Sequence, residues 1–447
     1  MLIIYNAHLV DKNFFGTGYV ICENKKITKV ELNKGEKPCV LQNAQFINAE
    51  GLTLMPAFID MHAHFRYPGQ PQKEDLDSGL MAAKNGGFGT LVLMPNTNPV
   101  ISSYEQAVSV INEAHSKKMS NIFQSVSITK NFDGTDTSHI ETLNNSDIPV
   151  ITEDGHDVLN ADIMLDGMKK AAAKKIIVSC HCEDPTLAAK AKVFRQQALE
   201  LMKQYKIPAW GVLPENTHVP EKVIDEISSC LSAANKLLQT AEDVCTYRNI
   251  ELADLAGCKV HIAHVSTKNS IDCIRNAKAK KYKCTCEVTP HHLALTGTDF
   301  PKILALVNPP LRSELDRRAL IEALRDGTAD VISTDHAPHT AEDKAKGAPG
   351  FTGSETAFAV CNTVLVKQEN FSLNKLSELM SARPAEILGL KKGLLQAEYD
   401  ADLVLVDENE KWLVNAADFS SKGKASPFDN TMLTGKVKAL FVAGQKI

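Results

Sequence analysis

The chain has 447 residues and a formal net charge of -5, so it lacks the strong positive charge that nucleic-acid and anionic-membrane partners favour. Hydrophobic residues make up 44% of it, an ordinary share for a soluble globular protein. This length suits one large domain with a smaller one beside it.

The N-terminal segment MLIIYNAHLV has no basic stretch before its apolar run, and that run is too short for a secretory signal. No run approaches the roughly 18 apolar residues that a membrane-spanning helix needs. We therefore expect a cytoplasmic protein with neither a membrane nor a nucleic-acid partner. The 11 cysteines are scattered, many of them in apolar runs, and are expected to be reduced and structural.

Both ends of the chain predict short strands joined by turns, without a long helix. Segments such as YVICENKKITKV in 1–52, and DADLVLVDE and TGKVKALFVAGQKI in 393–447, have this pattern. Neither end is expected to fold alone. We predict that the two ends pair into one small β-sandwich domain.

Between the ends, short apolar runs rich in β-branched residues alternate with amphipathic helical patterns. Such alternation is typical of a parallel sheet that is covered on both faces. Eight runs predict an α/β fold with a (β/α)8 barrel of the TIM type over 53–392. The runs cover 53–60, 89–95, 121–128, 148–154, 175–181, 259–265, 283–288 and 329–335.

Polar side chains follow the C-terminal ends of these strands, where a barrel of this type carries its active site. In chain order they are His62, His64, Asn96, Asp154, His181, His264, Asp335 and His339. His62 and His64 are two residues apart, so both point to the same face of an extended strand. An isolated H-x-H pair is more often held by local hydrogen bonds. Imidazoles and carboxylates from five strands together favour a metal site.

Other histidines lie near this predicted site. Strand parity directs His261 and His336 away from it, which indicates structural or supporting roles. His156 is expected at the surface. His291 and His292 follow the seventh strand, and the sequence leaves open whether they support the site or act in it.

At these residues the sequence resembles the cyclic amidohydrolases of the amidohydrolase superfamily, and within them the class I bacterial-type dihydroorotases. The resemblance runs over nearly the whole chain, in ordered blocks that are individually modest. The blocks are FIDMHAHFRYPGQPQKED, VLMPNTNPV, EDGHDV, HCED, HIAHVST, EVTPHHL, VNPPLR, STDHAPH and SPFDNTMLTGKV.

The resemblance implies one or two Zn²⁺ ions. The implied ligands are His62, His64, His181, His264 and Asp335, with Asp154 at the family's bridging position. Hydantoinases, dihydropyrimidinases and allantoinases typically have a carboxylated lysine there. The segment VITEDG has no lysine, which favours the dihydroorotases and leaves open whether Asp154 bridges two ions.

The resemblance also implies substrate contacts from Arg66, Asn96, Asn308 and His339. An arginine can hold the exocyclic carboxylate of dihydroorotate through paired hydrogen bonds. The asparagines offer amide donors and acceptors, with turn formation beside proline as the competing role. Asp335 is the implied catalytic residue, which takes a proton from the attacking water and delivers it to the ring nitrogen.

The implied function is that of a dihydroorotase, a hydrolase of C–N bonds in cyclic amides. It would interconvert N-carbamoyl-L-aspartate and L-dihydroorotate in pyrimidine (UMP) biosynthesis. The alternatives are a hydantoinase- or allantoinase-type enzyme, and an inactive homologue that serves as a scaffold. We expect a homodimer or larger homo-oligomer, and the sequence leaves open an association with aspartate transcarbamoylase.

Two segments differ from a plain barrel. The stretch HAPHTAEDKAKGAPGFTGSET is polar and rich in Gly and Pro, which predicts a mobile loop over the site, with backbone groups of 349–353 near the substrate. The chain between His181 and His264 is longer than the resemblance leads us to expect. The excess, around 207–240, has turn residues and then an amphipathic helix over 221–239, which is expected to pack on the barrel rim or to contact another subunit.

Overall fold

The computed structural model describes residues 1–38, 44–208, 219–297 and 306–447. Eight parallel strands form a closed ring at its centre. They are β6 (Phe58–Ala63), β7 (Phe88–Leu93), β8 (Asn121–Gln124), β9 (Val150–Thr152), β10 (Ile177–Cys180), β11 (Lys259–Ile262), β12 (Cys284–Val288) and β13 (Val331–Ile332).

The ring consists of two sheets that meet at two parallel bridges. One sheet contains β6 to β8 and the other contains β9 to β13. Val126 bridges to Ile151 at one junction, and Ala63 bridges to His336 at the other. The backbone N–H of His64 donates to the carbonyl oxygen of His336 over 2.8 Å, which reinforces the second junction. The predicted (β/α)8 barrel is confirmed.

The predicted first strand, 53–60, is wrong in one respect, because the structure divides it into two strands. β5 (Thr53–Pro56) pairs with strands of the chain ends, and only β6 belongs to the barrel. Between them the hydrogen bonds change partner: the N–H of Ala57 donates to Asp402 and that of Phe58 to Gly87. The whole run is apolar and buried, so no change of periodicity marks this switch in the sequence.

Helices surround the ring, and most of them begin at a residue whose side chain caps the first turn. They are α1 (Leu76–Gly86), α2 (Tyr104–Ser116), α3 (Ala161–Lys174), α4 (Pro185–Gln204), α5 (Glu221–Ala256), α6 (Lys268–Ala279), α7 (Pro290–Ala294), α8 (Glu314–Asp326), α9 (Ala341–Ala345), α10 (Ala357–Cys361), α11 (Leu373–Ser377) and α12 (Arg383–Leu388). Asp75 and Ser78 form a capping box before α1, and Gly87 ends that helix with a positive φ. After β8 only short 3-10 turns follow.

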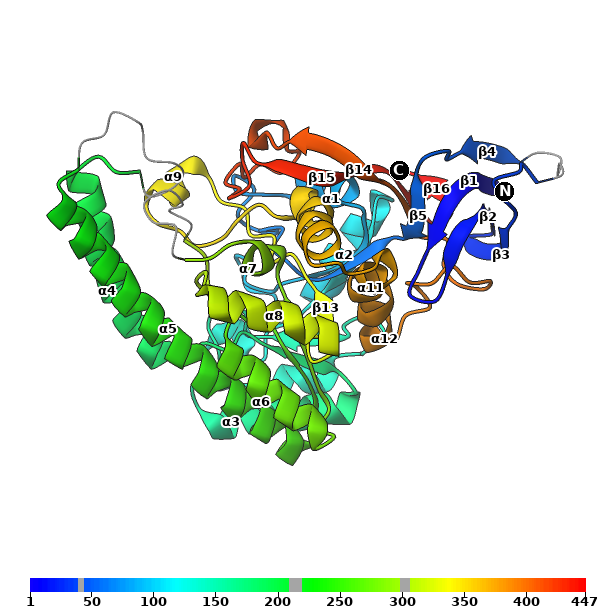
Figure 1. Cartoon of the computed structure of the whole chain (residues 1–447). Coiled ribbons are helices and arrows are strands. Elements are labelled where there is room, and N and C mark those ends of the chain that lie inside the picture. The colour runs from blue at the N-terminus through cyan, green and yellow to red at the C-terminus, as the bar shows by residue number, and fades with distance from the viewer. Residues whose placement is uncertain (39–43, 209–218, 298–305) are drawn as a thin grey trace.

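Strands from both ends of the chain join one mixed sheet beside the barrel (Figure 1). Its hydrogen-bonded order is β16-β15-β14-β5-β1-β2-β3, and β4 also pairs with β1. The remaining bounds are β1 (Leu2–Val10), β2 (Phe15–Glu23), β3 (Lys26–Leu32), β4 (Gln45–Asn48), β14 (Leu403–Leu413), β15 (Met432–Val442) and β16 (Gln445–Lys446). The two chain ends therefore pair, and β5 joins them although the domain boundary was predicted at 52.

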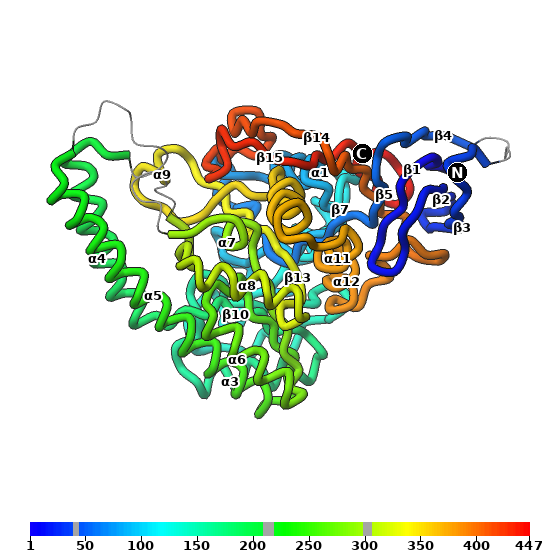
Figure 2. The backbone as a smooth tube through the Cα atoms, in the orientation of Figure 1, coloured from blue at the N-terminus to red at the C-terminus, as the bar shows by residue number. Residues whose placement is uncertain are grey.

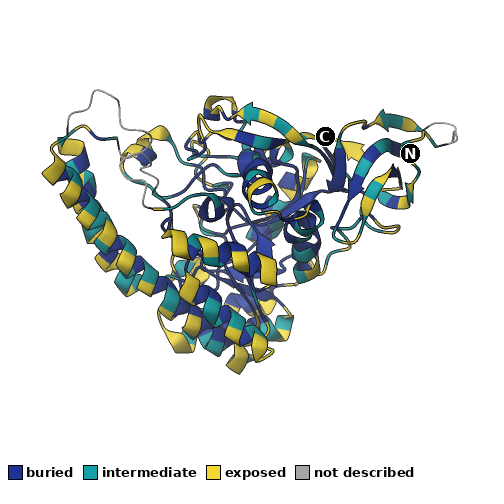
Figure 3. Ribbon diagram, in the orientation of Figure 1, coloured by how far each residue is buried: buried dark blue, intermediate teal, exposed yellow. Residues whose placement is uncertain are grey.

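The additional segment around 207–240 includes the first part of α5. Helices α4 and α5 pack along each other and form an arm that projects from the barrel (Figure 2). α5 has 36 residues, so it extends well beyond the predicted helix at 221–239. Of the turn residues predicted in this segment, Pro220 immediately precedes α5, whereas Gly211 and Pro214 fall within 209–218, outside the described residues. The far half of the arm has many exposed side chains, while the barrel centre is buried (Figure 3).

The helices and the cysteines of the described residues agree with two expectations from the sequence. None of the helices in this part of the chain is both long and apolar enough to span a bilayer. The ten cysteines that the structure describes are unpaired, and most are buried. They are Cys22, Cys180, Cys182, Cys230, Cys245, Cys258, Cys273, Cys284, Cys286 and Cys361.

Candidate metal centre

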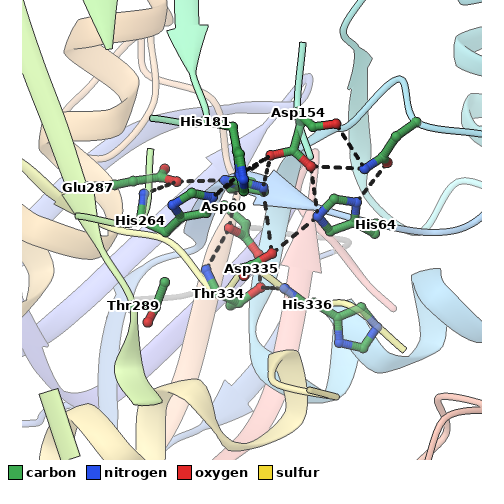
Figure 4. Close-up of polar contacts among 12 residues, drawn as sticks. Asp60, His64, Asp154, His181, His264, Glu287, Thr289, Thr334, Asp335 and His336 are labelled. Carbon is green, nitrogen blue, oxygen red and sulfur yellow. Dashed lines mark hydrogen bonds and ion pairs between the residues drawn. The ribbon is translucent and has the colours of Figure 1, made fainter. Parts of the chain in front are cut away.

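The predicted ligands meet at the C-terminal mouth of the ring. They come from β6 and from the residues that follow β6, β9, β10, β11 and β13. No residue in the group is more than 6% exposed. The group comprises His62, His64, Asp154, His181, His264 and Asp335, and Figure 4 labels all of them except His62.

His62, His64 and Asp335 form one cluster. The Nε2 atom of His64 lies 3.2 Å from Oδ1 of Asp335, and Nε2 of His62 lies 3.6 Å from the same oxygen. All three side chains can place a ligand atom within 4.8 Å of the others. The H-x-H pair thus directs both imidazoles to one point, as the two-residue spacing predicts.

Asp154 lies between this cluster and a second pair of histidines. Its Oδ2 is 3.5 Å from His64 Nε2, while its Oδ1 is 3.3 Å from His62 Nε2. Oδ1 also lies 3.5 Å from Nδ1 of His181 and 3.9 Å from Nε2 of His264. One carboxylate therefore faces both groups of imidazoles (Figure 4).

Most of these separations fit a metal ion better than they fit hydrogen bonds, although His64 lies at hydrogen-bond distance from Asp335, and Nδ1 of His181 lies 2.8 Å from Nε2 of His264. Ligands about 2.0–2.1 Å from a tetrahedral ion stand about 3.3–3.4 Å apart, whereas N–H···O hydrogen bonds are about 2.7–3.2 Å long. Nε2 of His62 is buried, and no hydrogen bond to it is found among the described residues, although two carboxylates lie at 3.3 and 3.6 Å. The donor set therefore suits a bound cation such as Zn²⁺.

Hydrogen bonds fix the orientation of both histidines of the H-x-H pair. Nδ1 of His62 lies 2.7 Å from Oε1 of Glu287, and Nδ1 of His64 lies 2.9 Å from Oδ1 of Asn96. When Nδ1 carries the proton in each ring, the Nε2 lone pair is free to bind a metal. The Nδ2 of Asn96 also donates to Asp154 Oδ2 over 2.9 Å.

Sequence reasoning missed Glu287 and Asp60. Glu287 lies within β12, is 1% exposed, and contacts His62 and His261 together with the backbone N–H of His264. Asp60 accepts hydrogen bonds from the N–H groups of His62 and Thr334. Each is a lone carboxylate within an apolar strand, and a buried carboxylate needs a hydrogen-bond or ionic partner. This pattern could have indicated both residues.

Three residues of the mouth have left-handed backbone conformations that non-glycine residues rarely adopt. Their φ angles are 55° at Arg66, 32° at His264 and 47° at Asp335. Such conformations persist only where surrounding structure imposes them, and they concentrate at functional sites.

The charges in the mouth shift the pKa values of its carboxylates. Burial alone would raise the pKa of Asp335, but contact with His64 and the neighbouring His62 lower it well below its usual range. For His62, burial opposes protonation, yet Asp154 and Glu287 outweigh it and raise the pKa. Asp335 is therefore ionised at neutral pH and able to accept a proton.

The predicted substrate residues lie in three places. Nη2 of Arg66 is 3.1 Å from Nε2 of His339, and Nε of Arg66 donates to the carbonyl oxygen of Pro338. Asn308 instead accepts a 2.6 Å hydrogen bond from Nη1 of Arg195 on α4. Asn96 lies among the ligands, bonded to His64 and Asp154 as described above.

The other histidines mostly have contacts of the expected kind. His261 is buried against Glu287, and His336 accepts hydrogen bonds from the backbone of Gly353 and Ser354. His156 is exposed. His291 and His292 are buried at 3% and 2% exposure, and Nε2 of His292 bonds to the Pro309 carbonyl, which indicates support of the 308–310 turn.

Residues 53–447 match the amidohydrolase family. The chain is 37% identical to a dihydroorotase from Clostridium botulinum, over 99% of this chain and 98% of that protein. It is 36% identical to a dihydroorotase from Bacillus subtilis, with 96% of each chain covered.

Solved structures agree on the fold. An L-hydantoinase (dihydropyrimidinase) from Arthrobacter aurescens superposes with a TM-score of 0.83 at 22% identity, over 100% of this chain and 95% of that chain. A dihydropyrimidinase from Brevibacillus agri gives a TM-score of 0.78 at 20% identity, over 100% and 94%. At such identities the likeness concerns the fold alone. The chain belongs to the amidohydrolase family and, through its full-length relatives, to the dihydroorotases.

Proposed function

We propose that this protein is a zinc-dependent dihydroorotase that reversibly converts N-carbamoyl-L-aspartate into L-dihydroorotate. The proposal rests above all on Asp154, whose two oxygens face two separate groups of imidazoles at one barrel mouth. The full-length similarity to dihydroorotases supplies the substrate.

We assign the ligands to two positions. His62, His64 and Asp335 would hold one ion, and His181 and His264 would hold a second, with Asp154 facing both groups. When bound, zinc supplies a Lewis acid that polarises the ring carbonyl and acidifies water.

The protein's own residues orient the substrate and move the proton. Arg66 holds the substrate carboxylate, with His339 beside it and Asn308 as a further polar contact. Asp335 accepts the proton of the attacking water and passes it to the departing ring nitrogen. In the ring-closing direction the same carboxylate takes the proton from the attacking carbamoyl nitrogen.

The rival of the same class is a hydantoinase or allantoinase. The structures of that kind support only the fold, and the bridging position here holds Asp154 where such enzymes have a carboxylated lysine. The scaffold alternative is disfavoured because every implied ligand is present and turned into the mouth.

We place the enzyme in the cytoplasm, in the pathway to UMP, and expect a homodimer or larger homo-oligomer. Val244, Tyr247 and Leu255 on α5 are 51%, 60% and 69% exposed, and this apolar surface would be covered in an assembly of copies. Light scattering after size exclusion measures that state, and its repetition with aspartate transcarbamoylase tests an association between the two.

The activity is tested by assaying dihydroorotate, hydantoin and allantoin side by side with one preparation of known metal content. We expect turnover of dihydroorotate alone, its loss on chelation and its return with zinc. Turnover of hydantoin or allantoin in preference, or a metal-free preparation inert to all three, contradicts the proposal.

A further inference from the structure

A cavity of about 1040 Å³ lies beside the predicted substrate residue His339. The end of α4, helix α9 and the segment 422–425 line it. The last of these segments is held in place by Thr352, whose N–H and Oγ1 donate to the carbonyl oxygens of Ala425 and Gly423. Three parts of the chain that are distant in sequence therefore build its walls.

The walls carry a strong excess of positive charge. Six lysines line the cavity against a single acidic residue, Glu200. The lysines are Lys203, Lys206, Lys344, Lys346, Lys422 and Lys424. Lys346 pairs with Glu342, and Lys422 pairs with Asp75.

Three of these lysines keep an uncompensated charge. In the described ranges, Lys203, Lys206 and Lys424 form no ion pair with a carboxylate, and all three are exposed. Lys424 donates to the carbonyl oxygen of Phe419. A concave surface with one sign of charge concentrates ions of the opposite sign.

The cavity borders the predicted substrate residues through His339. His339 lines it, and Nε2 of His339 is 3.1 Å from Nη2 of Arg66. The positive charge therefore continues from the cavity to the residue assigned to the substrate carboxylate.

We propose that this cavity is the entrance for the anionic substrates and that its lysines draw dicarboxylates towards Arg66. The inference rests on the proposed function, because N-carbamoyl-L-aspartate carries two carboxylates and dihydroorotate carries one. The cavity recognises charge rather than shape, so its effect grows with the negative charge of the ligand and falls as salt screens the lysines.

The test neutralises the unpaired lysines in the variant Lys203→Gln/Lys206→Gln/Lys424→Gln. A matched control, Lys25→Gln/Lys34→Gln/Lys259→Gln, removes three exposed lysines from the chain-end sheet and from the opposite end of the barrel. Because one equilibrium constant links the two directions, the variant must lower kcat/KM equally for both substrates. Charge selectivity is therefore read from inhibitors that do not react, succinate with two carboxylates and its monoamide, succinamate, with one.

We expect the cavity variant to keep kcat and to lose on the order of tenfold in kcat/KM at low salt. The Ki of succinate should rise several-fold and that of succinamate much less, and the salt dependence of kcat/KM should flatten. The control should match the wild type. If the cavity variant has unchanged Ki values for both inhibitors and an unchanged salt dependence, the cavity is not the substrate entrance, and the proposed function is unaffected.

Two further outcomes are distinguishable. Succinate inhibition that is noncompetitive in the wild type and lost in the variant overturns the entrance in favour of a separate anion site. If the wild-type protein does not interconvert the two substrates, the proposed function is wrong, and the proposed role of the cavity is wrong with it.

Discussion

Nδ1 of His62 lies 2.7 Å from Oε1 of Glu287, and both side chains are 1% exposed. This buried contact holds the imidazole with its Nε2 towards Asp154 and Asp335. A carboxylate in this position also increases the basicity of a ligating histidine.

Glu287→Gln should therefore weaken metal binding about 10- to 100-fold without unfolding the barrel. The amide can still accept a hydrogen bond, but its charge is lost. Competition with a chromophoric chelator measures the affinity, and His261→Asn, which removes a contact to the other oxygen, is the matched control with a smaller effect. Wild-type zinc affinity in Glu287→Gln means that the contact does not serve the metal.

Asp335→Ala should abolish turnover, with a loss of at least about 10²-fold, because the proton acceptor is removed. Zinc should stay largely bound, since five of the six assigned ligands remain. Steady-state assays and metal analysis of the same preparation measure both quantities. Asp157→Asn is the control: this buried carboxylate pairs with Arg248 outside the mouth, so activity should persist. Near-normal activity of Asp335→Ala refutes the assigned role.

Arg195 of the α4–α5 arm donates to Oδ1 of Asn308 over 2.6 Å and to the carbonyl oxygen of Val307 over 3.3 Å. Arg195→Ala should raise KM several-fold with a smaller change in kcat, because Asn308 loses its orientation. A double-mutant cycle with Asn308→Ala tests this. If the arginine acts through the asparagine, the double variant is no worse than Asn308→Ala, whereas additive effects contradict that role.

Lys344 should make stability depend on pH. Burial, with Arg195 nearby, lowers its pKa from 10.5 to about 7. Between these values the unfolded lysine holds a proton that the folded one has released, so the free energy of unfolding rises with pH. The melting temperature of the wild type minus that of Lys344→Met should increase from pH 7 to about 10. A difference that stays constant over this range excludes the linkage.

The sequence was most informative where burial and periodicity coincide. Most of the barrel strands were predicted within a few residues, because parallel strands buried on both faces form clear apolar runs. The boundary between β5 and β6 could not be predicted, because both strands are fully buried and their apolar sequences do not indicate different pairing partners.

In the candidate site, too, some residues could be predicted from the sequence and others could not. Its ligands could be predicted because strand ends in a barrel converge on one mouth. Glu287 could not be placed by that rule, because it lies inside its strand and not at the end. The contact of Arg195 with Asn308 depends on how the arm packs, which no local pattern encodes.

β5 pairs with β1 on one side and β14 on the other, and only Ala57 separates it from the strand that carries His62. Trimming either terminus would leave one edge of β5 without its hydrogen-bonding neighbour. A deletion at either end of the chain can thus reduce metal binding at His62. Affinity tags should therefore be added to the intact ends and should not replace terminal residues.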